Sequence, residues 1–225
     1  MIDFYYNLGP NPMKVALLLE ETELEYRAIP VDMLEGEQFD PAFTKLNPNN
    51  KLPVIVDGDA VVFDSNGILL FLAEKTGRFL PGPDPVARGA LLSWLMFIAT
   101  GVGPYSGQAV HFRHYAPEPK DYADQRYSFE ARRHYEILDK RLADRPWLLG
   151  DDYTIVDMAL WGWARNIAHV IGPDAAQRFQ SVARLVAAID ARPAAKRVDA
   201  FRERHKFNQN FDEKARRMLF GHLQA

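Results

Sequence analysis

Strand signals are confined to the first third of this 225-residue chain, and this asymmetry is the feature that most constrains its fold. Residues 2–6 are short and aromatic-rich, and residues 26–31 form a second predicted strand. Between them, apolar residues recur at helical spacing after Asn11 and Pro12, which we interpret as an N-cap and the first helical position. The pattern predicts a parallel strand pair closed by a right-handed helical crossover.

A hairpin and a covering helix complete this first region. Residues 53–56 and 60–63 flank an Asp-Gly-Asp sequence, which is a strong hairpin signal. Ser65 then precedes an apolar helix over residues 67–75 and is a good N-cap candidate. With a short connecting helix before the hairpin, the predicted order is βαβαββα, a thioredoxin-like α/β arrangement.

The second half of the chain predicts an all-helical domain. Asp84-Pro85 offers a cap and a first-turn proline after a proline-rich linker, and residues 121–142 are amphipathic over six turns. Further helices are predicted over residues 154–170, 174–191 and 194–207. The expected domains are 1–78 (thioredoxin-like), 79–85 (linker), 86–207 (all-helical) and 208–225 (a tail that is helical or a poorly ordered arm).

Composition excludes several classes of function. The chain has no cysteine, so it has no disulfide, no cysteine-ligated metal and no catalytic thiol of its own. With 27 Lys and Arg against 30 Asp and Glu, it carries a net charge of −3, which argues against nucleic acid or an anionic membrane as the main partner.

Two further features of the sequence bear on the cellular location of the protein. The N-terminus lacks a signal-peptide pattern, and we expect a cytoplasmic protein. The uncharged residues 90–110 are too interrupted by glycine, proline and polar residues for a membrane span, and we expect a buried helix that runs into an irregular segment.

Three separated blocks resemble the cytosolic glutathione transferases: residues 47–55, 63–77 and 147–157. More narrowly, Gly9-Pro10-Asn11, residues 36–39 and residues 111–114 resemble the bacterial nu-class and fungal Ure2-like branch. Disulfide-bond reductase activity toward glutathionyl disulfides is characteristic of that branch. The resemblance therefore implies glutathione as a bound cosubstrate, with one or two molecules per site.

The resemblance assigns the glutathione contacts. It implies that the Leu52–Pro53 bond is cis and that Leu52 pairs with the cysteinyl part of glutathione as an added strand would. Asp64 and Ser65, with N–H groups at the helix start, would hold the γ-glutamyl end. The family usually has Glu where Asp64 stands, and the competing interpretation of Ser65 is a simple N-cap.

Asn11 is the predicted catalytic residue. A free thiol has a pKa of about 8.5, and a helix N-terminus with nearby donors favours the thiolate. The resemblance implies that the Asn11 amide donates to the glutathione sulfur, whereas the residues alone favour an N-cap. Many proteins of the branch have Thr where this chain has Gly9, so a possible hydroxyl donor is missing here.

Further candidates come from both halves of the chain. Gln38 and Lys51 can reach the glycyl carboxylate, although Lys51 is equally well explained as a solvated lysine. By resemblance, Arg133 reaches glutathione. Candidates for the second-substrate pocket are Gly9, His111, Phe112, His114 and Arg132.

Two patterns are better explained by structure than by chemistry. His111 and His114 lack a carboxylate at ligand spacing, so we expect no metal site. Thr154 and Asp157 form a predicted capping box with a buried carboxylate.

The predicted function is a glutathione-dependent disulfide-bond reductase acting on a small disulfide or electrophile. Without cysteine, the attacking sulfur must belong to glutathione. Weak conjugating or peroxidase activity can coexist with this function, and a non-catalytic regulatory or scaffold protein is the alternative from another class. The resemblance also implies a homodimer.

Overall fold

The computed structural model describes residues 1–221, which form two compact units. One unit contains residues 1–72 together with residues 193–221, and the other contains residues 73–192. The sequence-based boundaries follow the order of elements along the chain and stay a prediction. Packing divides the chain differently because its last helices return to the first unit.

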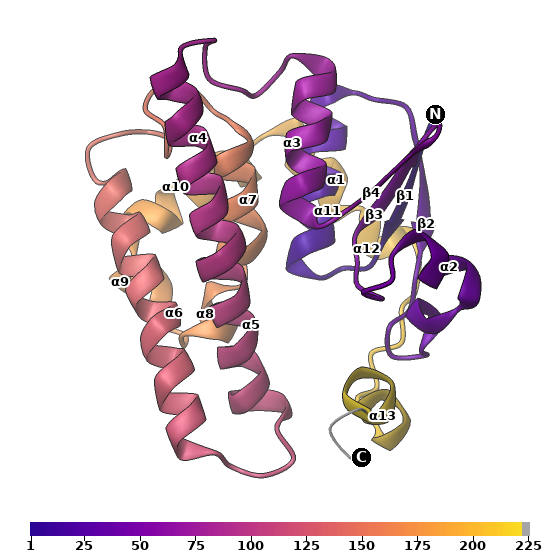
Figure 1. The fold of residues 1–225 in the computed structure, drawn as a ribbon. Helices are drawn as coiled ribbons and strands as arrows, with labels where there is room; N and C mark the ends of the chain where they lie inside the picture. The colour runs from indigo at the N-terminus through magenta and orange to yellow at the C-terminus, as the bar shows by residue number, and fades with distance from the viewer. Residues whose placement is uncertain (222–225) are drawn as a thin grey trace. The chain divides into compact units, whose positions relative to one another are not determined.

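A four-stranded mixed sheet forms the centre of the first unit, in the order β2-β1-β3-β4 (Figure 1). The strands are β1 (Ile2–Tyr6), β2 (Tyr26–Pro30), β3 (Val54–Asp57) and β4 (Ala60–Phe63). β1 pairs in parallel with β2 and antiparallel with β3, and β3 pairs antiparallel with β4. Ile2, Phe4 and Tyr6 are all buried, as the two-residue period of a strand dictates. The predicted thioredoxin-like topology is confirmed.

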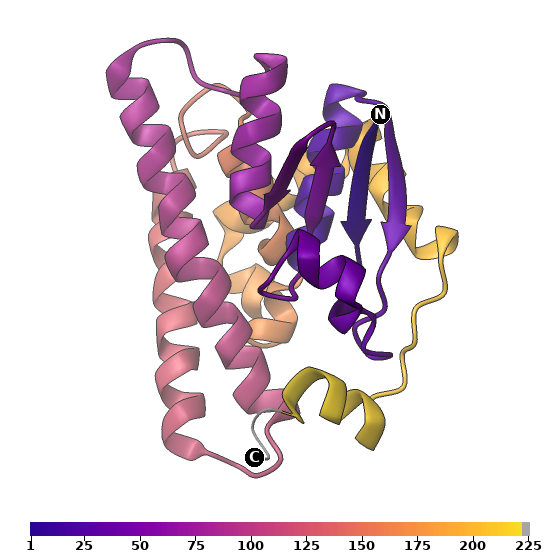
Figure 2. The same cartoon turned by 45° about the vertical axis from the view of Figure 1, so that its right-hand side comes forward.

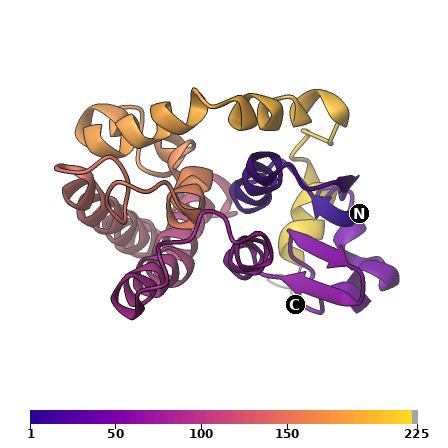
Figure 3. The ribbon, with the colours of Figure 1, turned by 90° about the horizontal axis from the view of Figure 1, so that it is seen from above.

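Helices cover both faces of this sheet. α1 (Pro10–Thr22) and α3 (Ser65–Thr76) lie on one face, and α2 (Pro41–Leu46) lies on the other, preceded by the 3₁₀ turn η1 (Glu37–Phe39) (Figures 2 and 3). Five consecutive residues of α1, from Val15 to Leu19, have no solvent exposure. Such complete burial identifies α1 as the central helix of this unit.

The end of the chain completes the core of the first unit. α11 (Pro193–Asp199) packs on α1, and α12 (Phe201–Arg204) follows it. The fully buried ring of Phe201 lies 5.0 Å from that of Tyr6 and 6.4 Å from that of Tyr26. The sheet therefore depends on residues almost 200 positions away for part of its apolar cover.

A final helix, α13 (Glu213–Phe220), is held by the loop that follows β2. The Asn208 backbone N–H donates to Asp32 at 2.6 Å, and the Asn208 side chain donates to Glu35 at 2.6 Å. Lys214 also forms an ion pair with Glu35. Residues 222–225 of the predicted tail lie outside the described residues.

One glycine permits the close approach of α13. Gly36 has φ +87°, and a Cβ atom there would lie 2.6 Å from the Met218 sulfur. The next turn places the Gln38 side-chain amide 3.5 Å from the Met218 carbonyl. A left-handed glycine thus allows the tail helix to lie directly on the β2–α2 loop.

The second unit contains a long helical stretch beside an antiparallel helix, α6 (Asp121–Leu142), whose bounds match the prediction (Figure 2). The stretch is built from α4 (Pro85–Phe97), the π-helical turn η2 (Ile98–Val102), α5 (Gly103–Val110) and a second π-helical turn, η3 (His111–Tyr115). As predicted, Asp84 caps the start of α4.

The expected irregular segment before residue 110 is wrong, because the chain remains helical there. The Gly103 N–H bonds to the Ile98 carbonyl five residues back, and this π turn carries the helix past Pro104, which has no N–H to donate. Gly101 permits close packing, since a Cβ atom there would lie 2.6 Å from a ring nitrogen of His134. By length and composition alone, the stretch Pro85–Tyr115 could cross a membrane, and core helices of soluble proteins meet the same criterion.

Three predicted helices are each divided in two. Residues 154–170 form α7 (Ile155–Ala164) and α8 (Ile167–Val170), and residues 174–191 form α9 (Ala175–Arg178) and α10 (Gln180–Asp190). Residues 194–207 divide into α11 and α12 in the same way. Between α9 and α10, Phe179 has φ −116° and ψ 66°, which is outside helical geometry. Apolar spacing predicted these regions but not the single residues that interrupt them.

Buried hydrogen bonds fix the start of α7 to the preceding loop of the second unit. Asp157 is fully buried and accepts hydrogen bonds from the Leu148 N–H at 2.8 Å and the Thr154 N–H at 2.9 Å. The Thr154 hydroxyl accepts in turn from the Val156 N–H, so the predicted capping box is confirmed. Burial raises the pKa of Asp157 to about 6, and the hydrogen bonds donated to it oppose that shift.

We expect Asp157→Asn to destabilise the protein. The substitution turns one acceptor oxygen into an NH₂ group that faces N–H donors, and a buried donor left without a partner costs about 1–3 kcal/mol. The free energy of unfolding from urea denaturation at pH 8 should fall by about that amount, whereas Asp152→Asn at an exposed position should leave it unchanged. Equal stability of both variants would contradict the role of Asp157.

We expect Glu35→Ala to loosen the tail. The variant loses the ion pair to Lys214 and the hydrogen bond from Asn208, and exposed pairs of this kind contribute modestly. Tryptic cleavage within residues 206–217 should accelerate roughly two- to fivefold. The matched control Glu25→Ala, at another exposed glutamate, should be cut like the wild type, and equal cleavage of all three proteins would contradict the proposed anchoring.

Candidate functional site

The first turn of α1 begins two residues earlier than predicted. Gly9 is the N-cap and Pro10 the first helical residue, so Asn11 is the second residue of the helix and its interpretation as an N-cap is wrong. The Asn7 side-chain oxygen accepts from the Gly9 N–H at 2.8 Å, and a Cβ atom at Gly9 would lie 2.9 Å from that oxygen. This bond closes a local turn just before the helix, where no side chain caps α1, and a small residue at position 9 leaves room for the Asn7 side chain.

The start of α3 is capped by Asp64 rather than by Ser65. Asp64 has φ +68°, and its Oδ1 accepts from the N–H groups of Asn66 at 2.9 Å and Gly67 at 3.1 Å. Ser65 is the first helical residue and is buried. The N-cap interpretation of Ser65 is therefore wrong. The Asp64 carboxylate already accepts from two first-turn N–H groups, and the contact of this helix start with a ligand stays a prediction.

The loop before β3 is held in one conformation by its own side chains. The Asn47 side chain donates to the Lys51 carbonyl at 2.7 Å and accepts from the Asn49 N–H at 3.0 Å. The Leu52–Pro53 bond that follows is cis, as the resemblance implied. Lys51 and Leu52 are thereby held just before the start of the inner strand β3, where they line one cavity with the first residues of α1 and α3.

These three segments enclose a cavity of about 350 Å³, a size suited to a small ligand. The cavity brings together six of the predicted residues: Asn11, Lys51, Leu52, Pro53, Asp64 and Ser65. Asn47, Asn49 and Phe63 complete the lining. A cation and an anion, Lys51 and Asp64, thus line one cavity together with neutral hydrogen-bonding groups, which suits a ligand carrying both a carboxylate and an ammonium group.

Sequence reasoning missed a buried cation close to this cavity. Lys14, one turn after Asn11 on α1, is 1% exposed, and its ammonium donates to the Asn66 side-chain oxygen at 2.9 Å. Burial lowers the pKa of Lys14 to about 7, and the Asp64 carboxylate opposes this shift. The available signal was a lysine inside a run of apolar helix residues.

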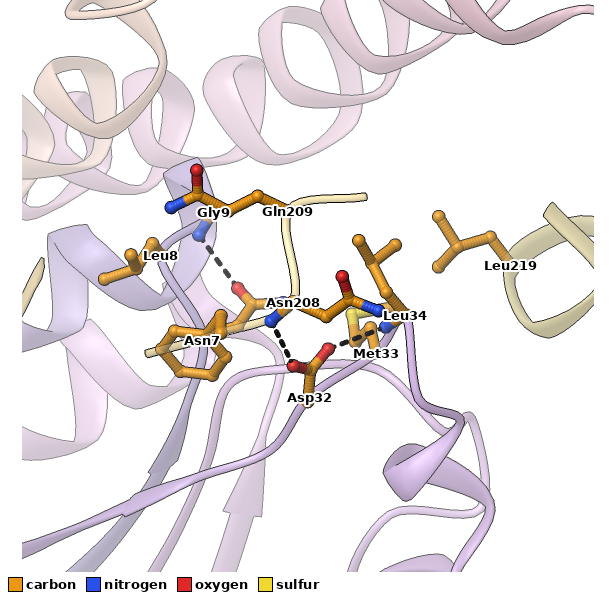
Figure 4. Close-up of a pocket in the computed structure, with 10 residues that line it drawn as sticks. Asn7, Leu8, Gly9, Asp32, Met33, Leu34, Asn208, Gln209 and Leu219 are labelled. Carbon is orange, nitrogen blue, oxygen red and sulfur yellow. Dashed lines mark hydrogen bonds between the residues drawn. The ribbon is translucent and has the colours of Figure 1, made fainter. Parts of the chain in front are cut away.

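A second, largely apolar cavity of about 410 Å³ lies beside the β1–α1 turn (Figure 4). It is lined by Asn7, Leu8, Gly9, Asp32, Met33, Leu34, Phe207, Asn208, Gln209 and Leu219. The Asp32 carboxylate accepts from the N–H groups of Leu34 and Asn208 and so ties the β2 loop to the tail (Figure 4). Gly9 lines this cavity, and Asn11, two residues later, lines the first one.

Gln38 lies outside the lining of both cavities. Its side chain is 2% exposed, its amide donates to the Met218 carbonyl at 3.5 Å, and its oxygen Oε1 is buried without a hydrogen-bond partner in residues 1–221. The tail helix covers this residue in the present conformation. A contact with a small ligand would require the Gln38 amide to leave Met218.

The predicted residues of the η3 turn lie in the second unit. The Phe112 ring stacks on Tyr127 at 5.3 Å and has the His111 ring at its edge. The His114 ring stacks on His169 at 4.1 Å, and its Nε2 lies 3.0 Å from the His169 carbonyl oxygen. Their assignment to a substrate pocket stays a prediction. Within residues 1–221, no three His, Cys, Asp or Glu side chains are grouped as metal ligands would be.

The two predicted arginines of α6 differ in their surroundings. Arg133 donates twice to Glu130, at 2.9 and 2.7 Å. The Nε atom of Arg132 is buried and has no hydrogen-bond partner among the described residues. Both assignments stay predictions.

Known proteins resemble this chain in both halves of its sequence. Residues 2–74 match the glutathione S-transferase N-terminal domain, and residues 130–204 match a glutathione S-transferase C-terminal domain. The chain is 48% identical over 170 residues to the disulfide-bond oxidoreductase YfcG of Escherichia coli strain K12, covering 72% of this chain and 79% of that protein. The disulfide-bond oxidoreductase YghU of the same strain is 40% identical over 211 residues, covering 85% and 72%.

Solved structures agree with the sequence relatives. A glutathione transferase of Burkholderia graminis, crystallised with two glutathione molecules bound per subunit, superposes with a TM-score of 0.83 at 36% identity, covering 91% of this chain and 89% of that one. With both domain matches in order and relatives this similar along most of the chain, the protein belongs to the glutathione S-transferase family.

Proposed function

We propose that this chain is a glutathione-dependent disulfide-bond oxidoreductase of the cytoplasm. The observation that carries the proposal is the cavity that joins Asn11, Lys51, Leu52, Asp64 and Ser65 in a chain without cysteine. Disulfide exchange requires a thiolate, and glutathione held in this cavity would supply it. The names of the two Escherichia coli relatives and the two glutathione molecules in the Burkholderia graminis structure support this function.

The polar lining of the cavity matches the ends of glutathione. Asp64 and Ser65 would hold the γ-glutamyl end, Lys51 the glycyl carboxylate, and the Leu52 backbone the cysteinyl unit beside Pro53. The hydrogen bond from the Gln38 amide to the Met218 carbonyl is long, and a glycyl carboxylate could accept from this amide instead of the carbonyl. Arg133 remains a proposed contact on the basis of family resemblance.

Asn11 would stabilise the thiolate. As the second residue of α1 it lies at the positive end of the helix dipole, and its amide can donate to an anionic sulfur. The thiolate attacks one sulfur of the substrate disulfide, forming a mixed disulfide with glutathione and releasing the other sulfur as a thiolate that takes up a proton. A second glutathione then attacks the mixed disulfide, releasing the remaining substrate thiol and oxidised glutathione.

The second substrate would lie toward Gly9. The apolar cavity beside the β1–α1 turn is lined by Gly9, and only Pro10 separates Gly9 from Asn11 in the other cavity. A disulfide bound in the apolar cavity can therefore approach the start of α1. By family resemblance, His111, Phe112, His114 and Arg132 of the second unit stay proposed contacts of the second substrate.

The function is tested by binding and turnover in sequence. The wild-type protein should be retained on immobilised glutathione and should then reduce a model glutathionyl disulfide in the presence of free glutathione. Retention without turnover would contradict the enzymatic function and favour a non-catalytic binding protein.

Two substitutions test Asn11. Asn11→Ala removes one charge-assisted donor, which should cost about 1.5–3 kcal/mol, or roughly ten- to a hundredfold in turnover rate, with a raised pKa of bound glutathione and little change in affinity. Asn11→Asp should lose more activity because it places an anion beside the sulfur, while a first-turn carboxylate remains favourable for α1. Wild-type turnover by Asn11→Asp, with an unchanged unfolding midpoint, would contradict the assignment.

We also propose a homodimer, with no nucleic acid or membrane as partner. Val61 and Phe63 on the edge strand β4 are 44% and 45% exposed, and Leu92 and Met96 on α4 are exposed as well. Val61 and Phe63 lie two residues apart on one strand, and neighbouring exposed apolar groups mark surfaces that pack against another protein. The net charge of −3 gives no attraction to phosphate backbones or anionic lipids.

Light scattering should therefore report twice the chain mass at micromolar concentration. Val61→Lys would place a charge in the apolar surface and should shift the protein toward monomer, whereas Glu25→Lys, at an exposed polar position, should not. A wild-type protein that is monomeric at micromolar concentration would contradict the dimer.

A further inference from the structure

Lys14 is a buried titratable group for which the proposed chemistry has no use. It is 1% exposed in the second turn of α1, directly before five apolar residues that have no solvent exposure. Lysine is almost never fully buried without a partner, because removing its charge from water is costly. A lysine at this position therefore calls for a compensating interaction.

The partner is the first turn of α3. The Lys14 ammonium donates to the Asn66 side-chain oxygen at 2.9 Å, and the Asn66 backbone N–H donates to Asp64 Oδ1 at 2.9 Å. Two hydrogen bonds therefore connect Lys14, through Asn66, to Asp64, which is one of the residues that line the 350 Å³ cavity. The ammonium lies behind the α3 start, at the end where Asp64 and Ser65 face the cavity.

Few charges face Lys14 from the elements around it. Asp64, at the start of α3, is the charge that acts on it and favours the ammonium form. Arg197 of α11, the other helix packed on α1, pairs with Glu20 in the last two turns of α1. Burial acts in the opposite direction to Asp64 and lowers the pKa of Lys14 to about 7, so this group gains and loses its proton near neutral pH.

We propose that Lys14 is a positioning residue whose ammonium, held behind the start of α3 by Asn66, strengthens the binding of the ligand's α-carboxylate and takes up a proton as glutathione binds. The inference rests on the proposed placement of the γ-glutamyl end at Asp64 and Ser65. An anion brought to this helix start would favour the charged form of Lys14, and by reciprocity the charged form would favour the anion.

The sign of the pH dependence follows from this coupling. Lys14 is charged below its pKa, so affinity is highest in acid and falls as the pH rises through the pKa of the free and then of the bound protein. If the bound carboxylate raises the pKa of Lys14 by one unit, affinity falls about tenfold between pH 6 and pH 9. Within that interval, binding is accompanied by proton uptake.

The experiment uses S-methylglutathione, which has no thiol to titrate. Its affinity is measured by calorimetry from pH 6 to pH 9, in buffers of low and high ionisation enthalpy, for the wild type, Lys14→Met and Lys14→Gln. The histidines and the amine of the ligand titrate alike in all three proteins, so the difference between them isolates Lys14. Lys14→Gln keeps a donor to Asn66 without a charge and thereby separates hydrogen bonding from proton uptake.

We expect the wild type to take up protons near pH 7.5 and both variants to lose this uptake and most of the pH dependence. Variants that bind with the wild-type slope and proton uptake would overturn the inference. Complete rescue by Lys14→Gln, pH profile included, would also overturn it, because it would reduce Lys14 to a structural donor.

Failure of the variants to fold and failure of the wild type to bind the ligand have different consequences. If the unfolding transition shows that neither variant folds, the absence of net proton uptake by the wild type would itself overturn the inference. If the wild type binds no S-methylglutathione at any pH, the proposed function fails, and the inference fails with it.

Discussion

The carboxylate of Asp64 is the contact on which most of the candidate site depends. By accepting two N–H groups of α3 it fixes where that helix begins, and its left-handed backbone turns the chain from β4 into the helix. The same group faces the cavity, and its charge acts on Lys14 behind it. One side chain therefore serves as helix cap, as cavity lining and as counter-charge.

The sequence predicted much of the fold because local signals agreed with the tertiary structure. The hairpin around Gly58, the cap at Asp84 and the capping box of Thr154 each depend on neighbours within a few residues. Single residues that stop a helix, such as Phe179, escaped because apolar spacing continues through them. The cis Leu52–Pro53 bond came from family resemblance, since the residues alone favour trans.

The candidate site was predictable where its residues gather at one end of the sheet, and less so where segments distant in the sequence meet. Asn11 was assigned a cap that belongs to Gly9, because Asn is the stronger capping residue and this helix begins without any side-chain cap. Gln38 is covered by Met218, 180 positions away, and no local pattern predicts such a contact. Lys14 has a partner 52 positions away, so its burial could be suspected from the sequence but not explained.

The return of the chain to its first unit has a consequence for biosynthesis. The strands and α1 emerge from the ribosome first, yet α11, which packs on α1, and Phe201, which packs on Tyr6, are made more than 110 residues after α3 ends. The helical unit between them can close while translation is still in progress, since its residues are contiguous. The unit that carries the candidate site is thus the first to begin synthesis and the last to be completed. Its apolar face stays partly exposed until the final helices have been made.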